Sequence, residues 1–254
     1  MLKWQVAIAI KNPKVLYLVI ELLKKLDLKF EVCTPGDSRC EDAKLVVTTL
    51  DDCNNHQARV IVDENMDPDF TSIEILSKLY DIHNPILATI GVDPGMRFGI
   101  ALVIDGVVLF KNSLSTPGLA AQLTSRLESY VTRLFPKCRT IVREGTGSKL
   151  YSALYLRALI QQFPSLNVEL VNEHRTTLSG GVTSDQSSAI LIAGRSGRPH
   201  EESDKILEPK MGYVRSLKLF VRQFTRNKRE LSTNEARAIL FGELSLDCIL
   251  TDDC

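Results

Sequence analysis

The chain has 254 residues, of which 44% are hydrophobic and 24% charged, as in an ordinary globular protein with one large domain or two modest ones. No apolar run approaches the roughly 18 residues that a membrane span needs, so no membrane-spanning segment is expected. The net charge is zero, but residues 1–85 carry 10 basic and 14 acidic side chains, and residues 86–254 carry 21 and 17. A polyanionic partner is therefore expected to meet the second half.

The cysteine pattern favours a cytoplasmic protein with reduced thiols. There is no CxxC pair, no metal-finger spacing and no signal peptide. The six cysteines are Cys33, Cys40, Cys53, Cys138, Cys248 and Cys254.

Residues 1–82 predict a small, Rossmann-like α/β domain. An apolar strand over 5–10 precedes Asn12 and Pro13, which are typical of a helix start, and apolar residues then recur at helical spacing to Leu26. Short strands over 30–33, 44–48 and 59–62 and a helix over 71–80 complete a mostly parallel sheet. Asp51 and Asp52 are interpreted as a solvated turn rather than a cation site. The domain is expected to act in docking or assembly.

The second half opens with a β-hairpin that carries one acid at an unusual place. Apolar residues 88–92 lead into Asp93, Pro94 and Gly95 supply turn chemistry, and residues 99–104 form the second strand before an Asp-Gly turn. A carboxylate where an apolar strand meets a turn costs free energy unless a cation or hydrogen-bond donors meet it. Asp93 is therefore the first candidate functional residue.

Two further strands also end on acids. A helix over 119–134 precedes the strand 139–143, which leads to Glu144 and a Gly-rich turn before the helix that begins near Lys149. The strand 168–171 leads to Glu173, and Asp185 begins another helix. Because functional residues of α/β sheets lie at the carboxyl ends of strands, we expect these four acids to converge.

Clustered carboxylates repel one another unless a divalent cation neutralises them, so the pattern predicts a Mg²⁺ or Mn²⁺ site with Asp93, Glu144, Glu173 and Asp185 as ligands. Two such ions would stabilise the attacking and leaving oxygens of phosphodiester hydrolysis. Simpler interpretations remain open. Asp185 can be a helix N-cap, Glu144 can cap its turn or pair with Arg143 or Lys149, and Glu173 can be a surface charge.

The ordered set of motifs resembles the RuvC/YqgF branch of the RNase H-like nucleases over residues 88–195. Gly91-Val-Asp-Pro-Gly95 is similar to that branch's first strand motif, and Glu144 matches the strand glutamate of RuvC-type resolvases. The segment 172–177 is similar to a YqgF motif whose acid falls on Glu173, and Asp185-Gln-Ser-Ser-Ala189 resembles the final helix. The resemblance implies an RNase H-like mixed sheet flanked by helices over 87–198. It also implies metal-dependent cleavage of a nucleic-acid backbone.

The sequence departs from that pattern at three places. The spacing from Thr177 to Asp185 is short, Ser188 stands where resolvases often have a second acid, and Glu144 and Glu173 belong to different subfamily patterns. These departures put the reach of Asp185 to the metals in doubt, and make one of the two glutamates a candidate for a supporting position.

Residues 199–254 predict a helical C-terminal extension with a basic face. Glu235 lies in a Ser-x-x-Glu capping box before a helix and is not taken as a catalytic acid. The basic residues of the extension are expected to contact phosphates together with Arg97 and Lys149, although a solvated helix face explains them equally well. They are Arg215, Lys218, Arg222, Arg226 and Arg229.

The leading hypothesis is a Mg²⁺- or Mn²⁺-dependent nuclease acting on structured DNA or RNA. The alternatives are a nucleic-acid-binding protein of the same fold without catalysis, and an actin-like phosphotransferase. The phosphotransferase is disfavoured because no second half repeats the Asp-x-Gly motif. Junction cleavage would favour a homodimer.

Overall fold

The computed structural model describes residues 4–37, 40, 42–52, 58–172 and 185–251. Its contacts divide the chain into two compact units, Met1–Pro85 and Ile86–Cys254, so the C-terminal helices belong to the second unit. Within the described residues, no helix combines the length and apolar character needed to cross a membrane.

The first unit is a parallel sheet with strand order β2-β1-β3-β4, which confirms the mostly parallel sheet predicted from the sequence. The Asn12 side chain accepts hydrogen bonds from the backbone N–H groups of Lys14 and Val15, and Asp67 caps the second helix in the same way. Val6, Ile8 and other apolar side chains form the core. The elements are β1 (Trp4–Ala9), α1 (Pro13–Lys25), β2 (Phe30–Val32), β3 (Ala43–Thr48), β4 (Arg59–Ile61) and α2 (Pro68–Leu79).

Two details of this unit correct the sequence interpretation. Cys33 and Cys40 form a disulfide, so these two thiols are not reduced; a turn in which Asp37 N–H donates to the Thr34 carbonyl brings their Cα atoms to 6.0 Å. Asp52 is not in a solvated turn: it is 8% exposed and accepts a 2.8 Å hydrogen bond from the Lys11 backbone N–H. That hydrogen bond holds the pKa of the Asp52 carboxyl below its usual value.

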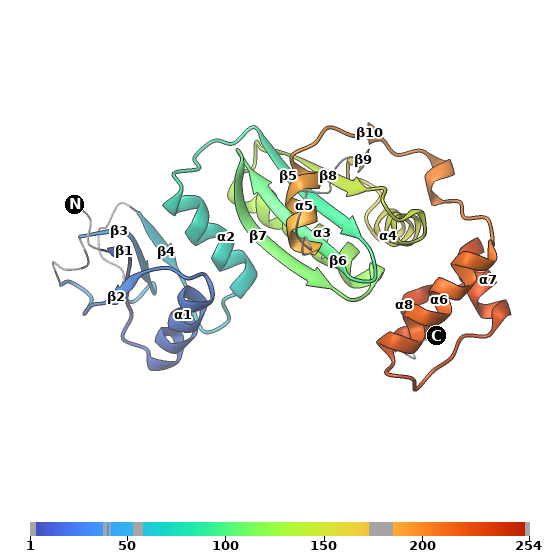
Figure 1. Cartoon of the computed structure of the whole chain (residues 1–254). Coiled ribbons are helices and arrows are strands. Elements are labelled where there is room, and N and C mark those ends of the chain that lie inside the picture. Colours follow the sequence, from blue (N-terminus) through green and yellow to red (C-terminus); the bar gives the residue numbers. More distant parts are fainter. Residues whose placement is uncertain (1–3, 38–39, 41, 53–57, 173–184, 252–254) are drawn as a thin grey trace, which may run out of the picture. The chain divides into compact units, whose positions relative to one another are not determined.

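The second unit is built on a six-stranded mixed sheet with strand order β10-β9-β8-β5-β6-β7 (Figure 1). The first three strands in sequence, β5, β6 and β7, form an antiparallel meander, and β8 and β9 extend the sheet from β5 in parallel. The strands are β5 (Leu87–Pro94), β6 (Phe98–Ile104), β7 (Val107–Leu114), β8 (Arg139–Gly145), β9 (Val168–Val171) and the short β10 (Arg198–Pro199).

Helices cover both faces of this sheet. On one face, α3 (Pro117–Leu134) and α4 (Lys149–Gln162) meet through a buried 2.9 Å hydrogen bond between the Thr124 and Tyr155 hydroxyls. The Tyr155 ring contacts Phe98 of β6, which fixes α4 on that face. On the other face, α5 (Asp185–Ala193) crosses β5 and β6 (Figure 1). A meander followed by two parallel crossover strands, with the last helix on the opposite face, is the RNase H-like fold.

The C-terminal helices α6 (Met211–Phe224), α7 (Thr233–Phe241) and α8 (Leu246–Thr251) follow a short 3₁₀ helix, η2 (Glu202–Lys205). The predicted capping box is present in α7: Ser232 and Glu235 exchange side-chain and backbone hydrogen bonds, and Gly242 ends the helix with φ 81°. Two contacts anchor these helices. Arg157 of α4 donates to the carbonyls of Ile239 and Leu240, and Asp247 accepts from the Gly118 N–H.

Candidate active site

Asp93 lies near the carboxyl end of β5, the strand shared by the meander and the parallel half of the sheet. It is half-buried and pairs in register with Gly99 of β6. Because side chains alternate along a strand, Asp93 lies on the same face as Gly91, the face that α5 covers.

Asp185, the first residue of α5, comes to the same place. A Cβ atom at Gly99 would overlap the Asp185 backbone oxygen, and a Cβ at Gly91 would overlap the Ala189 oxygen one turn further along α5. Only glycine at both positions lets the helix lie this close to the sheet. Since Gly99 is the register partner of Asp93, the sheet and α5 bring Asp93 and Asp185 to the same edge of the sheet. We call the edge that carries these two carboxylates the rim.

The turn between β5 and β6 adds a cation to this rim. The Arg97 Nε atom lies 3.8 Å from Asp185 Oδ2; the Arg97 side chain is 66% exposed and the Asp185 side chain 41%. Such an exposed pair contributes little to stability, so Arg97 is available to an incoming anion.

Glu144 does not join this rim, which corrects the expectation that it converges with Asp93. It pairs in register with Val92, so its side chain lies on the α4 face, opposite Asp93. It is completely buried, and neither carboxyl oxygen has a hydrogen-bond partner among the described residues. Burial therefore raises the pKa of the Glu144 carboxyl well above its usual value; the nearby Ser152 hydroxyl offsets part of that increase, and Asp204 adds to it.

Near the end of β8, the side chain that faces α5 belongs to Arg143. A carboxylate of β8 would have to occupy this position to lie on the same face as Asp93. Arg143 Nε lies 3.0 Å from Glu169 Oε2 of β9, and Arg143 Nη1 donates a 2.8 Å hydrogen bond to the Ala193 carbonyl at the end of α5. The sequence interpretation missed this role and considered Arg143 only as a partner of Glu144. Strand alternation was the signal available, because it places neighbouring residues 143 and 144 on opposite faces.

Glu173, the remaining predicted ligand, lies outside the described residues. Within the parts of the chain that the structure describes, no group of three or more His, Cys, Asp or Glu side chains is arranged to hold a metal ion. The described rim thus supplies two carboxylates, Asp93 and Asp185.

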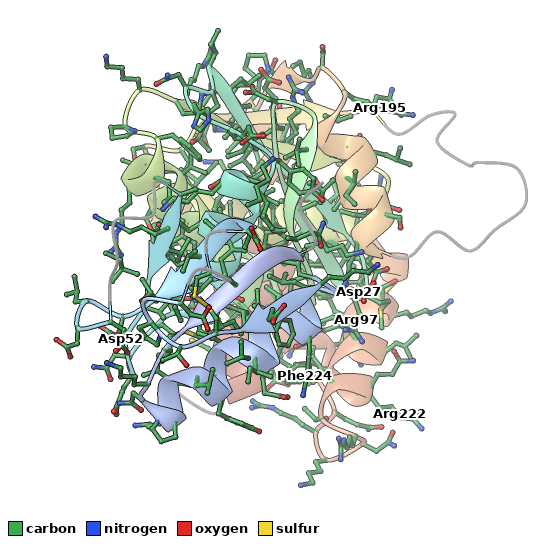
Figure 2. The ribbon with its side chains drawn as sticks, turned by 90° about the vertical axis from the view of Figure 1, so that its left-hand side faces the viewer. Asp27, Asp52, Arg97, Arg195, Arg222 and Phe224 are labelled. Atoms are coloured by element: carbon green, nitrogen blue, oxygen red, sulfur yellow. A yellow bond between two sulfur atoms is a disulfide. The ribbon has the colours of Figure 1, made fainter. Side chains whose placement is uncertain are left out.

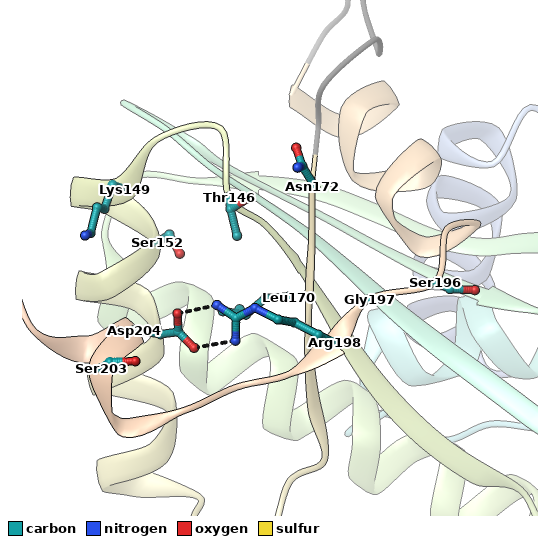
Figure 3. A pocket seen from close by; sticks show the side chains of 10 residues that line it. All are labelled: Thr146, Lys149, Ser152, Leu170, Asn172, Ser196, Gly197, Arg198, Ser203 and Asp204. Atoms are coloured by element: carbon teal, nitrogen blue, oxygen red, sulfur yellow. Dashed lines mark hydrogen bonds and ion pairs between the residues drawn. The ribbon is translucent and has the colours of Figure 1, made fainter.

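A polar cavity of about 640 Å³ opens where β8 and β9 end and α4 begins (Figure 3). Lys149, the first residue of α4, and Asn172, just beyond β9, line it. Arg198 also lines it but is neutralised by a two-pronged ion pair with Asp204, at 2.5 and 2.8 Å. Among the described residues that line the cavity, Lys149 is therefore the cation without an ion pair.

The predicted basic residues of the C-terminal extension do not all lie on one helix. Arg215, Lys218 and Arg222 belong to α6, but that helix ends at Phe224, so Arg226 and Arg229 lie beyond it. The helix cannot continue because residues 226 and 227 adopt left-handed backbone angles, φ 53° and 64°. Arg222 extends from the last turn of α6 (Figure 2).

The amino-acid sequence matches no protein-family model and no curated protein. Two X-ray structures of Argonaute from Marinitoga piezophila are similar in structure. The complex with a 5′ OH guide RNA is 10% identical with a TM-score of 0.26, and the complex with guide RNA and target DNA is 13% identical with a TM-score of 0.28. Each match covers 66% of this chain and 39% of the Argonaute chain, so this protein spans about two fifths of that length. Strand order and helix placement, rather than these distant likenesses, define the second unit as RNase H-like.

Proposed function

We propose that the second unit is a metal-dependent nuclease that hydrolyses phosphodiester bonds of structured DNA or RNA at the rim formed by Asp93 and Asp185. The observation that carries this proposal is the close approach of α5 to Gly99, the register partner of Asp93. It joins two carboxylates from distant parts of the sequence at the carboxyl end of the central strand, where α/β sheets place their functional groups.

The donor set suits a hard divalent cation such as Mg²⁺ or Mn²⁺, because both side chains offer carboxylate oxygens. Asp93 and Asp185 would hold it, and Glu173 is proposed as a further ligand. A pair of such ions, when bound, lowers the pKa of a coordinated water and stabilises charge on the leaving oxygen. The buried Glu144 is not included in this set.

Two cations of the chain are suited to position the nucleic-acid backbone. Arg97 lies beside Asp185 and is exposed, so its guanidinium can bind a phosphate next to the carboxylates. Lys149 at the start of α4 presents a second cation beyond the ends of β8 and β9. Together they would hold the scissile strand on the rim without taking part in proton transfer.

A second candidate function is nucleic-acid binding without catalysis. Arg143 favours it, because a guanidinium ion-paired with Glu169 stands at the α5-facing position of β8, while the neighbouring Glu144 faces the other layer. A site of this kind would keep the fold and the phosphate contacts but would lack a metal-binding carboxylate on β8.

The test is a panel of branched, duplex and single-stranded DNA and RNA substrates incubated with Mn²⁺ or Mg²⁺. Wild-type protein is expected to cleave at least one structured substrate, and Asp93→Asn and Asp185→Asn are expected to abolish cleavage while retaining binding. Asp105→Asn is the matched control, because it removes the same charge at the exposed β6–β7 turn, at the far end of β6.

Salt-sensitive binding with no cleavage by the wild-type protein, unchanged by Asp93→Asn, would favour the second candidate and reject the nuclease. Cleavage that survives both aspartate substitutions would reject the proposed rim.

A further inference from the structure

The end of α6 places an exposed aromatic ring beside a strongly basic turn. Phe224 is the last residue of α6, and the turn that follows carries Arg226, Lys228 and Arg229. A hollow of about 730 Å³ lies beside this turn and is lined by these four residues together with Thr225 and two apolar residues of α8. We call it the Phe224 hollow.

The basic turn is held in one shape by its own hydrogen bonds. Arg226 and Asn227 both have left-handed backbone angles, which residues other than glycine seldom adopt. The Arg222 Nε donates a 2.7 Å hydrogen bond to Asn227 Oδ1, and Arg229 Nη1 donates a 2.8 Å hydrogen bond to the Ile249 carbonyl of α8. Uncommon backbone angles that the surroundings maintain are frequent at binding sites. The turn is therefore ordered before any ligand arrives.

Phe224, the aromatic residue at the end of α6, is 38% exposed. Its ring lies nearly parallel to that of Phe220, with an interplanar angle of 14° and centroids 6.3 Å apart. Phe220 is buried at 2% exposure, so it fixes the orientation of the outer ring. Packing against Phe220 thus holds a partly exposed aromatic ring at the end of α6; Phe224 is labelled in Figure 2.

The charges next to the ring are available to a ligand. Arg226 and Lys228 are exposed, and within the described part of the chain neither forms an ion pair or a side-chain hydrogen bond. Arg229 differs, because it also pairs with Glu235 at 3.9 Å. The hollow therefore combines an aromatic ring with two unneutralised cations on an ordered turn.

We propose that the Phe224 hollow binds an unpaired nucleotide of a single-stranded nucleic acid, with the base stacked on Phe224 and the flanking phosphates on Arg226 and Lys228. A base stacked on an aromatic ring within a positively charged groove is the usual mode of single-strand binding, and it tolerates any base. A duplex offers the same phosphates but no free base face. The inference rests on the proposed function and names the part of the substrate, an unpaired segment, that this surface takes.

The experiment compares Phe224→Leu with the wild-type full-length protein by fluorescence anisotropy in EDTA, with no divalent cation present. The probes are a labelled 12-nucleotide oligo-dT and a blunt duplex of 12 base pairs. Leucine keeps apolar contact with Phe220 and removes the aromatic face. We expect single-strand affinity to fall by about 5- to 100-fold and duplex affinity to stay within twofold. Phe224→Trp is expected to restore single-strand binding, with tryptophan fluorescence quenched by oligo-dT.

The controls separate stacking from charge and from folding. Phe241→Leu removes another exposed aromatic, 57% exposed on α7 and outside the hollow, and is expected to leave both affinities unchanged. Lys228→Gln is expected to lower the affinity for both probes and to reduce the slope of log affinity against log salt concentration by about 1.

Equal single-strand affinity in wild type and Phe224→Leu would overturn the proposal, and so would an equal loss for both probes or no nucleic-acid binding at all. The failure of this proposal is distinguishable from the failure of the nuclease proposal. Asp93→Asn is tested by cleavage in the presence of a divalent cation, whereas Phe224→Leu is tested by binding in its absence.

Discussion

Asp93 and Glu144 stand on opposite faces of one sheet, although they lie on adjacent parallel strands and only one register step apart. Asp93 faces α5, where Asp185 meets it across Gly99, whereas Glu144 faces α4 and is sealed from solvent. One step of register therefore separates a carboxylate on an open rim from one enclosed in a hydrophobic layer.

Replacing the buried Glu144 is expected to stabilise the protein at neutral and alkaline pH. The folded-state pKa of Glu144 is raised by burial, so the folded protein keeps the proton to higher pH than the unfolded chain. The stability associated with that proton is fully present below the unfolded-state pKa and is lost as pH rises through the folded-state pKa. Glu144→Gln removes the titration, and each unit of pKa difference is worth about 1.4 kcal/mol.

Thermal unfolding measured from pH 4 to pH 9 checks this expectation. The melting-temperature difference between Glu144→Gln and wild type should be smallest near pH 4 and should grow in favour of the variant as pH rises. Glu230→Gln, which changes an exposed glutamate of the same unit, is the control and should show no such trend. A difference independent of pH would mean that Glu144 has the same pKa in the folded and unfolded states.

Most of the fold was predictable because its signals are local. Alternation of apolar residues, the Asn12 cap and the Ser232–Glu235 capping box each act within a few residues, and each is confirmed. The Cys33–Cys40 disulfide was not predicted, because cysteine spacing does not reveal that a turn brings the two Cα atoms together.

The candidate site was predictable only in part, because it depends on which face each strand residue occupies. Acids at strand ends singled out Asp93, which lies on the face that α5 covers, but Glu144 was grouped with it from position along the strand alone. The two-residue period puts Arg143 and Glu144 on opposite faces, but the register between β5 and β8 decides which of them shares the face of Asp93. The closeness of α5 to the sheet depends on Gly91 and Gly99 together, a relationship between segments that no local pattern reports.

Adding a methyl group at Gly99 is expected to destabilise the second unit and separate the rim. The new Cβ would overlap the Asp185 backbone oxygen, so α5 must move away from β6. Overpacking of this kind costs about 1–3 kcal/mol. Urea unfolding of Gly99→Ala should show that loss.

The matched control is Gly212→Ala in α6, where a Cβ meets nothing within 4 Å; it should be neutral or stabilising by up to about 1 kcal/mol. Equal midpoints for the two variants would contradict the close packing of α5.

The Arg143–Glu169 pair is expected to stabilise the α5 layer as a coupled unit. The two side chains are 14% and 21% exposed, so removing one leaves the other largely buried without its partner. We expect Arg143→Met and Glu169→Gln each to cost about 2–3 kcal/mol, somewhat less than breaking a fully buried pair. The double variant should cost clearly less than the sum of the two. A double-mutant cycle by chemical denaturation measures this coupling, and strict additivity would show that the pair contributes nothing.

Arg157 is expected to hold the C-terminal helices against α4. Its guanidinium donates hydrogen bonds of 2.6, 2.9 and 2.8 Å to the carbonyls of Lys205, Ile239 and Leu240, so one side chain satisfies the end of η2 and the last turn of α7. Arg157→Met keeps the apolar stem but leaves these carbonyls without their donors, at an expected cost of about 2–3 kcal/mol.

Because the lost bonds join the C-terminal helices to the rest of the unit, the variant should lose local order before it unfolds globally. Hydrogen exchange in α7 is expected to speed up by at least tenfold in Arg157→Met while exchange in β5 and β6 stays unchanged. Arg237→Met, which removes an exposed arginine of α7 with no side-chain partner in the described residues, is the matched control and should leave both regions unaltered. Uniform acceleration across β5, β6 and α7 would instead show that Arg157 supports the whole unit rather than the attachment of its last helices.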